Sequence, residues 1–193
     1  MLTSNFYILQ FRLRAKGVLS RRSFLLIGPV AFLSALVGAE IPARQAIVGG
    51  NTEALPAVSI ICLGGAVICR IMHSRIHLQG GRVVIVNPLY SYDFPKCAVR
   101  KVDVRRGALV VIPKSADPDE EGVFAVGFAG SLIDMLFGTT DRAAATVRDY
   151  FDQAKGGQGS SDEVNRRLVI NPLADLLVLI AVVFGGISAV VLL

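Results

Sequence analysis

The sequence predicts an α+β membrane protein with three transmembrane helices and a small antiparallel β domain closed by one amphipathic helix. Three long stretches carry no charged residue, the middle of the chain reads as short strands between Gly and Pro turns, and a helical period follows it. With 193 residues, 53% hydrophobic content and a mean hydropathy of +0.58, the chain is too apolar for an ordinary soluble domain and too short for a large transporter.

The last apolar stretch is the clearest membrane helix. Leu176 to Leu193 spans about 27 Å as a helix, close to the thickness of the hydrocarbon core. Asn171 suits the N-cap and Pro172 the first helical position, which places Asp175 in the first turn. We interpret Asp175 as part of a capped helix start among the headgroups, rather than as an intramembrane proton relay.

Two further spans precede the β domain. Ser23 to Ala39 is uncharged and reaches a crossing length at Ile41, and Ala54 to Cys69 is followed by Arg70, which we expect to snorkel. An alternative for the first span is a twin-arginine export signal at Ser20 to Leu25. Such signals export folded cargo. Only about 15 residues separate the two apolar stretches, too few to fold alone, which argues against an export signal.

Basic residues flank the apolar stretches. The net charge is +5, but the segment from 73 to 163 is balanced, with 11 Lys and Arg against 12 Asp and Glu. The excess lies beside the membrane, so nucleic acid is not indicated. By the positive-inside rule, we expect the N-terminus and the β domain in the cytoplasm and the C-terminus outside, in the plasma membrane.

Small residues recur at four-residue steps in the last helix, as Ala181, Gly185 and Ala189. Such a stripe lets helices approach closely in lipid. It is open whether the stripe packs the three helices together, docks a partner, or reflects ordinary Ala and Gly usage.

No cofactor or metal site is indicated. Cys62, Cys69 and Cys97 form no C-x-x-C motif, and we expect buried thiols. His73 and His77 have the spacing of a helical metal pair, but they fall at an expected turn and in an expected strand.

Short strands are predicted at 75–79, 82–87, 89–94, 99–106, 108–112 and 123–128. Gly80-Gly81 indicates a hairpin turn. From Thr139, apolar residues at 143, 147, 150, 151 and 154 follow a helical period that Gly156-Gly157 ends. The apolar insert 131–138 is expected to plug one end of the sheet, with insertion into the bilayer as the alternative.

One basic cluster stands out in the β domain: Lys96, Arg100, Lys101, Arg105 and Arg106. An Arg-rich strand and turn can hold phosphate through bidentate contacts. The other interpretation is a solvated strand face near an anionic leaflet.

Two apolar spans followed by "RIHLQGGRVVIVNPLYSYDFPKCAVRKVDVRRGALVVIP" resemble the bacterial pleckstrin-homology-like (PH-like) membrane proteins of actinobacteria. The likeness covers roughly residues 20 to 155. It implies a partly open seven-stranded PH-like β-barrel or sandwich capped by a C-terminal helix, in a family most of whose members have no assigned activity. Two features depart from that family: Lys96 stands where a tryptophan often follows the proline, and the third span is additional.

The chain contains no G-x-S-x-G, no H-E-x-x-H and no phosphate-binding Gly loop, so we expect no enzymatic activity. The first functional hypothesis is a scaffold or accessory subunit that contacts a protein partner in a larger plasma-membrane complex. The alternative is a sensor of anionic lipid headgroups. The predicted segments are a basic N-terminal segment (1–22), a first span (23–41), an outside loop (42–54), a second span (55–72), the PH-like domain (73–156), a linker (157–167) and a third span (168–193).

Overall fold

The computed structural model describes residues 11–14, 17–115, 122–129, 139–153 and 164–191. The chain divides into two compact units. The sheet unit comprises Met1–Phe24 and Ser74–Val169, and the helix unit comprises Leu25–His73 and Ile170–Leu193.

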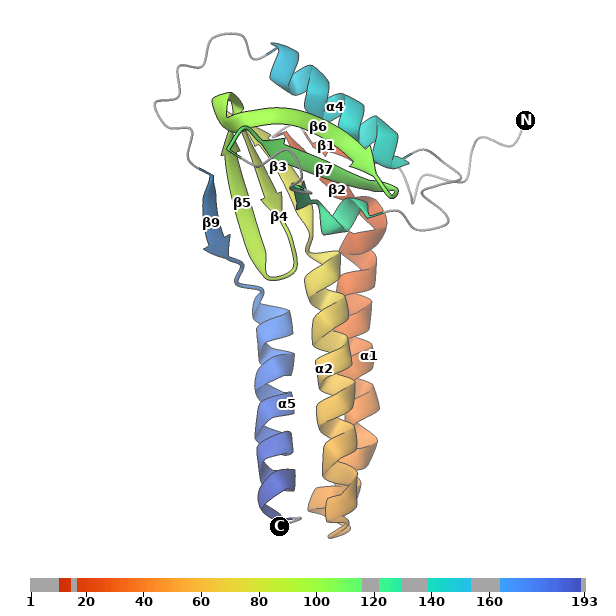
Figure 1. The fold of residues 1–193 in the computed structure, drawn as a ribbon. Coiled ribbons are helices and arrows are strands. Elements are labelled where there is room, and N and C mark those ends of the chain that lie inside the picture. The colour runs from red at the N-terminus through yellow and green to blue at the C-terminus, as the bar shows by residue number, and fades with distance from the viewer. Residues whose placement is uncertain (1–10, 15–16, 116–121, 130–138, 154–163, 192–193) are drawn as a thin grey trace, which may run out of the picture. The chain divides into compact units, whose positions relative to one another are not determined.

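Three long helices make up the helix unit: α1 (Arg22–Ile47), α2 (Leu55–Met72) and α5 (Pro172–Val191) (Figure 1). Each is long and apolar enough to cross a membrane. The prediction of three apolar helices is therefore confirmed.

Helix α1 is longer than the predicted first span. It continues past Ile41 through Pro42 to Ile47, so the first six residues of the predicted outside loop are helical. Glu40 and Arg44 form an exposed ion pair of 2.6 Å one turn apart, which supports the extension. A short 3-10 helix, η1 (Thr52–Ala54), then leads into α2.

The helix unit has small residues inside and large apolar residues outside. Leu26, Val37 and Val182 are each about two thirds exposed. The buried contacts between the helices are made mostly by small side chains: Ala35, Ala39, Cys62, Ala66, Cys69, Ala174 and Ala181. This distribution is typical of helices that pack by close approach in lipid.

Gly65 of α2 lies where both other helices come close. A Cβ atom at this position would overlap the Cβ of Ala35 in α1 and lie 3.2 Å from Leu177 Cδ1 in α5. At the neighbouring Gly64 a Cβ would meet nothing within 4 Å. Gly65 therefore permits the packing of three helices at one level.

The start of α5 is capped as predicted. Asn171 Oδ1 accepts a hydrogen bond from the Ala174 amide (3.4 Å), and Asp175 Oδ2 accepts one from the Asn171 amide (3.0 Å). The Asn171 side chain also donates to the Cys69 carbonyl of α2 (3.3 Å). Arg70, which we expected to snorkel, forms an ion pair with Asp175.

A six-stranded antiparallel sheet forms the larger part of the sheet unit, with the order β1-β2-β3-β4-β5-β9. Its strands are β1 (Phe11–Arg14), β2 (Val18–Arg21), β3 (Arg75–Gln79), β4 (Arg82–Val86), β5 (Tyr90–Pro95) and β9 (Asn165–Leu168). β1 and β2 come from the predicted basic segment 1–22, and β9 begins inside the predicted linker 157–167. The sheet therefore includes strands from the segments before and after the predicted PH-like domain.

The second sheet has three antiparallel strands, β6 (Val99–Arg105), β7 (Ala108–Pro113) and β8 (Val123–Phe124). Two 3-10 helices, η2 (Lys96–Ala98) and η3 (Val126–Phe128), flank it. The helix predicted after Thr139 is confirmed as α4 (Thr139–Gln153), which lies beside β6 (Figure 1).

Both sheets and α4 share one hydrophobic core. It includes Ile76, Ile85 and Phe94 of the first sheet, Leu109 and Val111 of the second, and Val147 and Phe151 of α4. Neither sheet is closed within the described residues, so the architecture shown is two open antiparallel sheets with a helix. The predicted plug at 131–138 and the helix stop at Gly156-Gly157 lie outside the described residues.

The predicted hairpin turn is confirmed. Gly80 and Gly81 have φ angles of 58° and 73°, the left-handed conformation that glycine adopts without strain. The β6–β7 hairpin turns in the same way through Arg106 (φ 52°) and Gly107 (φ 74°).

The register of the first sheet defines two ends. At one end Arg75, Val86, Ser91 and Arg167 pair successively across β3, β4, β5 and β9. The connections β2 to α1, α2 to β3 and β9 to α5 all leave the sheet here, and we call it the connection end. Gln79, Arg82 and Pro95 pair at the far end, four residues or roughly 14 Å away along the strands.

Candidate functional site

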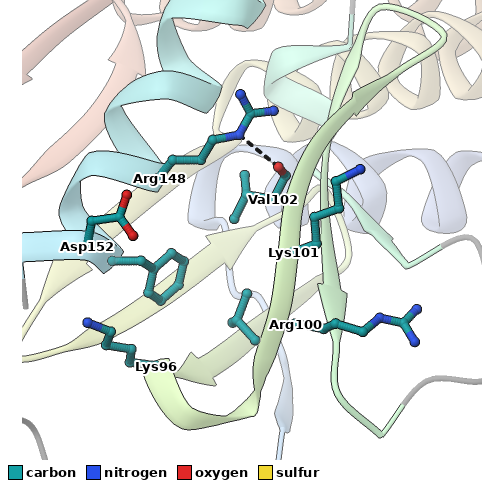
Figure 2. Close-up of a pocket in the computed structure, with 8 residues that line it drawn as sticks. Lys96, Arg100, Lys101, Val102, Arg148 and Asp152 are labelled. Carbon is teal, nitrogen blue, oxygen red and sulfur yellow. Dashed lines mark hydrogen bonds between the residues drawn. The ribbon is translucent and has the colours of Figure 1, made fainter.

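A basic pocket of about 470 Å³ lies between η2, β6 and α4 (Figure 2). Val99, Val102 and Phe151 contribute apolar surface. The charged residues that line the pocket are Lys96, Arg100, Lys101, Arg148 and Asp152. Four cationic groups and one carboxylate give the lining a net positive charge, and the volume is in the range of small-ligand sites.

Arg148 connects α4 to the edge of the second sheet. Its Nε donates to the Val102 carbonyl of β6 (2.9 Å), as Figure 2 shows. This contact holds a guanidinium group at the mouth of the pocket and satisfies a carbonyl on a strand that has no neighbour on that side among the described strands.

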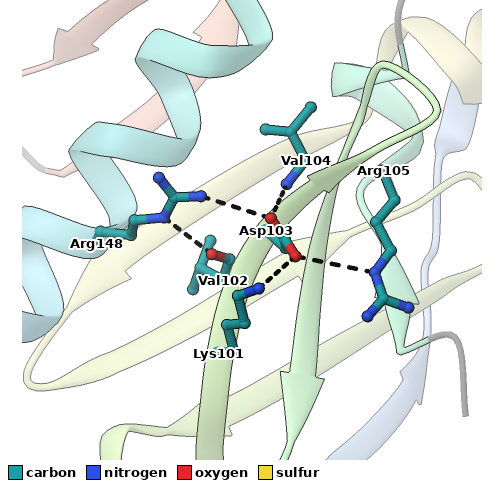
Figure 3. Close-up of polar contacts among 6 residues, drawn as sticks. All are labelled: Lys101, Val102, Asp103, Val104, Arg105 and Arg148. Carbon is teal, nitrogen blue, oxygen red and sulfur yellow. Dashed lines mark hydrogen bonds and ion pairs between the residues drawn. The ribbon is translucent and has the colours of Figure 1, made fainter. Parts of the chain in front are cut away.

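Asp103 is the anion that the cations of β6 and α4 share (Figure 3). Lys101 Nζ lies 2.7 Å from its Oδ2, and Arg105 Nε and Arg148 Nη2 lie 3.9 and 3.8 Å from its carboxylate oxygens. The hydrogen bond from Lys101, followed by that from the Val104 amide, lowers the pKa of Asp103 below its ordinary value. Asp103 therefore stays ionised and offsets part of the basic cluster.

The structure brings three of the five predicted cluster residues to the pocket. Lys96, Arg100 and Lys101 line it. Arg105 and Arg106 lie instead at the β6–β7 turn, at the other end of β6 from Arg100. In Figure 2 the Arg100 side chain extends away from Arg148 and Asp152.

Sequence reasoning missed Arg148 and Asp152. Both lie on α4, one turn apart, beside the core residues Val147 and Phe151. The helical period predicts that they flank the buried face, but it does not identify which strand the helix packs against. No sequence signal therefore joined them to the β6 cluster.

The pocket is at the far end of the first sheet. Lys96 directly follows Pro95, which pairs with Arg82 in the far-end row. The Gly81 amide at the β3–β4 turn donates to Tyr150 Oη of α4 (2.9 Å), which places this part of α4 at the same end.

The predicted helix-packing residues differ in their surroundings. Ala181 is buried, and its carbonyl accepts a hydrogen bond from Ser59 Oγ of α2 (2.9 Å). A Cβ at Gly185 would lie 3.2 Å from the same Ser59 Oγ, whereas Ala189 is exposed. Ala181 and Gly185 therefore face α2.

The cysteine and histidine residues form no joint site in the described part of the chain. All three cysteines are free thiols; Cys62 and Cys69 are buried, as predicted, and Cys97 is half-buried. His73 caps the end of α2 and His77 lies in β3. Within the described ranges no three His, Cys, Asp or Glu side chains group to hold a metal ion.

Chemically, the pocket is suited to holding an anion. The Arg148 guanidinium and the Lys96 ammonium can contact a carboxylate or phosphate, and Arg100 and Lys101 add positive charge at the edge of the pocket. The apolar surface accommodates a short aliphatic or aromatic group next to that anion.

Comparison of the chain with protein-family models, with curated proteins and with solved structures gives no match. The likeness to PH-like membrane proteins therefore stays a prediction.

Proposed function

We propose that this chain is a non-catalytic accessory subunit of a plasma-membrane complex, and that its basic pocket binds an acidic segment of a protein partner. The observation that carries the proposal is the grouping of Lys96, Arg100, Lys101 and Arg148 around one pocket with apolar surface. An acidic peptide presents carboxylates next to apolar side chains, which matches this lining.

The position of the pocket favours a protein partner over lipid headgroups. The chain connections to the helix unit leave from the opposite end of the sheet, roughly 14 Å away along the strands. Within the sheet unit, the pocket is therefore separated from the strand ends that continue into the apolar helices, which suits a pocket for a protein partner. The alternative is that the pocket binds anionic lipid headgroups, and the experiment below distinguishes the two.

Two features support the proposed PH-like character of the domain. Two antiparallel sheets and a following helix enclose one core, and the Asn87-Pro88 step joins the sheets. Asn87 Nδ2 donates to the Phe124 carbonyl (2.7 Å), and Asn87 Oδ1 accepts from the Val126 amide (2.9 Å).

The proposed orientation follows the charge distribution. Arg21, Arg22, Arg70, Arg166 and Arg167 all lie beside the ends of the apolar helices from which the sheet unit is reached. By the positive-inside rule these ends are cytoplasmic, with the sheet unit in the cytoplasm and the C-terminus outside.

Crosslinking followed by mass spectrometry on native membranes tests the proposal. The test variant is Arg100→Glu, which reverses a charge at the pocket, and the control is Arg142→Glu, the same reversal at an exposed position of α4. We expect a defined partner with the wild type and the control, and its loss with Arg100→Glu.

Binding of the detergent-solubilised protein to vesicles containing phosphatidylglycerol provides the second readout. An unchanged set of crosslinked proteins together with weaker vesicle binding in Arg100→Glu would favour the headgroup sensor. No effect of Arg100→Glu in either assay would contradict the role in binding given to Arg100.

A further inference from the structure

A second surface, at the connection end of the first sheet, combines exposed apolar, aromatic and basic side chains. We call it the β5–β9 patch; it consists of Leu89, Tyr90, Arg166, Arg167 and Leu168. Leu89 and Leu168 are 55% and 74% exposed, although large apolar side chains are usually buried in a soluble domain. They are neighbours, because Tyr90 pairs with Leu168 and the Leu89 carbonyl accepts from the Val169 amide (3.0 Å).

The polar part of the patch is ordered by stacking. The Arg166 guanidinium lies 3.5 Å from the centre of the Tyr90 ring and 5.8 Å from that of Tyr92. The N–H groups of a guanidinium lie in its own plane, so a guanidinium above an aromatic ring can still donate them to an anion. Arg167, the next residue along β9, is exposed as well and points to the other face, so the two arginines flank the edge strand.

The turn that presents Leu89 is held in place from both sides. The Asn87 amide donates to the Tyr90 carbonyl (2.9 Å), which closes the turn. The Asn87 side chain bonds to Phe124 in the second sheet and to Val126 in η3. Leu89 is therefore held outward by a hydrogen-bonded turn.

Chain connectivity limits how far this patch can lie from the bilayer. Only three residues separate Leu168 from Pro172, the first residue of α5, so at most about 14 Å of extended chain lies between them. The connections from β2 to α1 and from α2 to β3 leave from the same end of the sheet and are shorter still, with no residue and two residues between the elements.

We propose that the β5–β9 patch is a lipid-binding surface that docks the sheet unit on the headgroups of the membrane its own helices cross. Leu89 and Leu168 enter the boundary between headgroups and acyl chains, Tyr90 lies at headgroup level, and Arg166 and Arg167 contact anionic phosphates. This surface is distinct from the basic pocket, and neither depends on the other.

Tryptophan fluorescence tests this directly, because the chain contains no tryptophan. Leu89→Trp and Leu168→Trp each place a single reporter in the patch, at exposed positions where a larger side chain meets little resistance. Gln79→Trp, exposed at the far end of β3, is the control. Each full-length variant is reconstituted in phosphatidylcholine vesicles with and without phosphatidylglycerol, with and without brominated acyl chains.

For both patch variants we expect emission at shorter wavelength than for Gln79→Trp, and strong quenching by brominated lipid. Adding Arg166→Gln and Arg167→Gln to Leu89→Trp should remove the extra quenching that phosphatidylglycerol produces. Emission and quenching equal to those of Gln79→Trp at both positions would overturn the proposal. Quenching that is identical with and without phosphatidylglycerol would overturn the assignment of the two arginines to anionic headgroups.

Discussion

At the scale of single residues, each unit has one carboxylate that pairs with neighbouring cationic side chains. Asp103 is shared by Lys101, Arg105 and Arg148 on the surface of the sheet unit. Asp175 caps α5 and pairs with Arg70 of α2. Because Asp175 and Arg70 are less exposed than an ordinary surface pair, the Asp175 pair should contribute more to stability.

Replacing Asp103 should change the acid stability of the sheet unit. Its folded pKa is below the unfolded value of about 3.9, so the contribution is present above that pH and is lost as pH falls through the folded pKa. Asp103→Asn should therefore lower the free energy of unfolding near neutral pH by about 0.2–1 kcal/mol and flatten its decline in acid.

Urea unfolding followed by tyrosine fluorescence measures this change, because the tyrosines among the described residues, Tyr90, Tyr92 and Tyr150, belong to the sheet unit. Asp149→Asn, at an exposed position of α4, is the control. Identical pH profiles for Asp103→Asn and the wild type would show that the ion pairs around Asp103 do not stabilise the fold.

Asp175→Asn should destabilise the helix unit. It retains an oxygen that can accept from the Asn171 amide but removes the charge opposite Arg70, so we expect a loss of about 1–3 kcal/mol. Glu40→Gln breaks the exposed pair with Arg44 and should cost less than about 1 kcal/mol. SDS titration of the reconstituted protein compares the two, and equal losses would contradict the role given to Asp175.

At the scale of elements, the sequence predicts the regular segments well. The strands 75–79, 82–86 and 99–105 and helix α2 match the expected ranges because their patterns are unbroken and end at Gly, Pro or charged residues. The strands β1, β2 and β9 were not predicted. Each is only four residues long, too short for alternation to separate it from a basic loop, and each forms by adding to an existing sheet.

Helix packing was predicted only in part. The sequence indicated small residues in α5, and Ala181 and Gly185 do face α2. Among the described glycines of the three helices, however, Gly65 has the tightest contact with another helix. Gly64 and Gly65 are adjacent residues of the same type. Which of them faces the other helices depends on the rotation of α2 about its axis, and the sequence does not give that rotation.

This difference between the two glycines predicts opposite effects of the same substitution. Gly65→Ala should weaken helix association by about 1–3 kcal/mol, because the added Cβ overlaps Ala35. Gly64→Ala adds the same helix propensity without a contact and should leave stability unchanged or raise it by up to about 1 kcal/mol. SDS titration in bilayer mimetics measures both, and equal effects would contradict the packing described.

At the scale of the whole molecule, the two units present different surfaces. The helix unit has the exposed apolar faces that lipid requires. The sheet unit carries a basic pocket at its far end and the β5–β9 patch at its connection end. The sequence predicted the apolar helices and three of the pocket residues. It did not predict the pocket itself, because this depends on which strand α4 packs against.

The central claim is that three helices cross the plasma membrane with the sheet unit on its cytoplasmic side. Thiol labelling of intact cells with a membrane-impermeant maleimide tests it most directly, using Asn51→Cys before η1 and Gln79→Cys at the far end of β3. Both positions are exposed, and Cys97→Ser removes the thiol that is not fully buried. The account predicts labelling of Asn51→Cys in intact cells and of Gln79→Cys only after permeabilisation; labelling of Gln79→Cys in intact cells would contradict it.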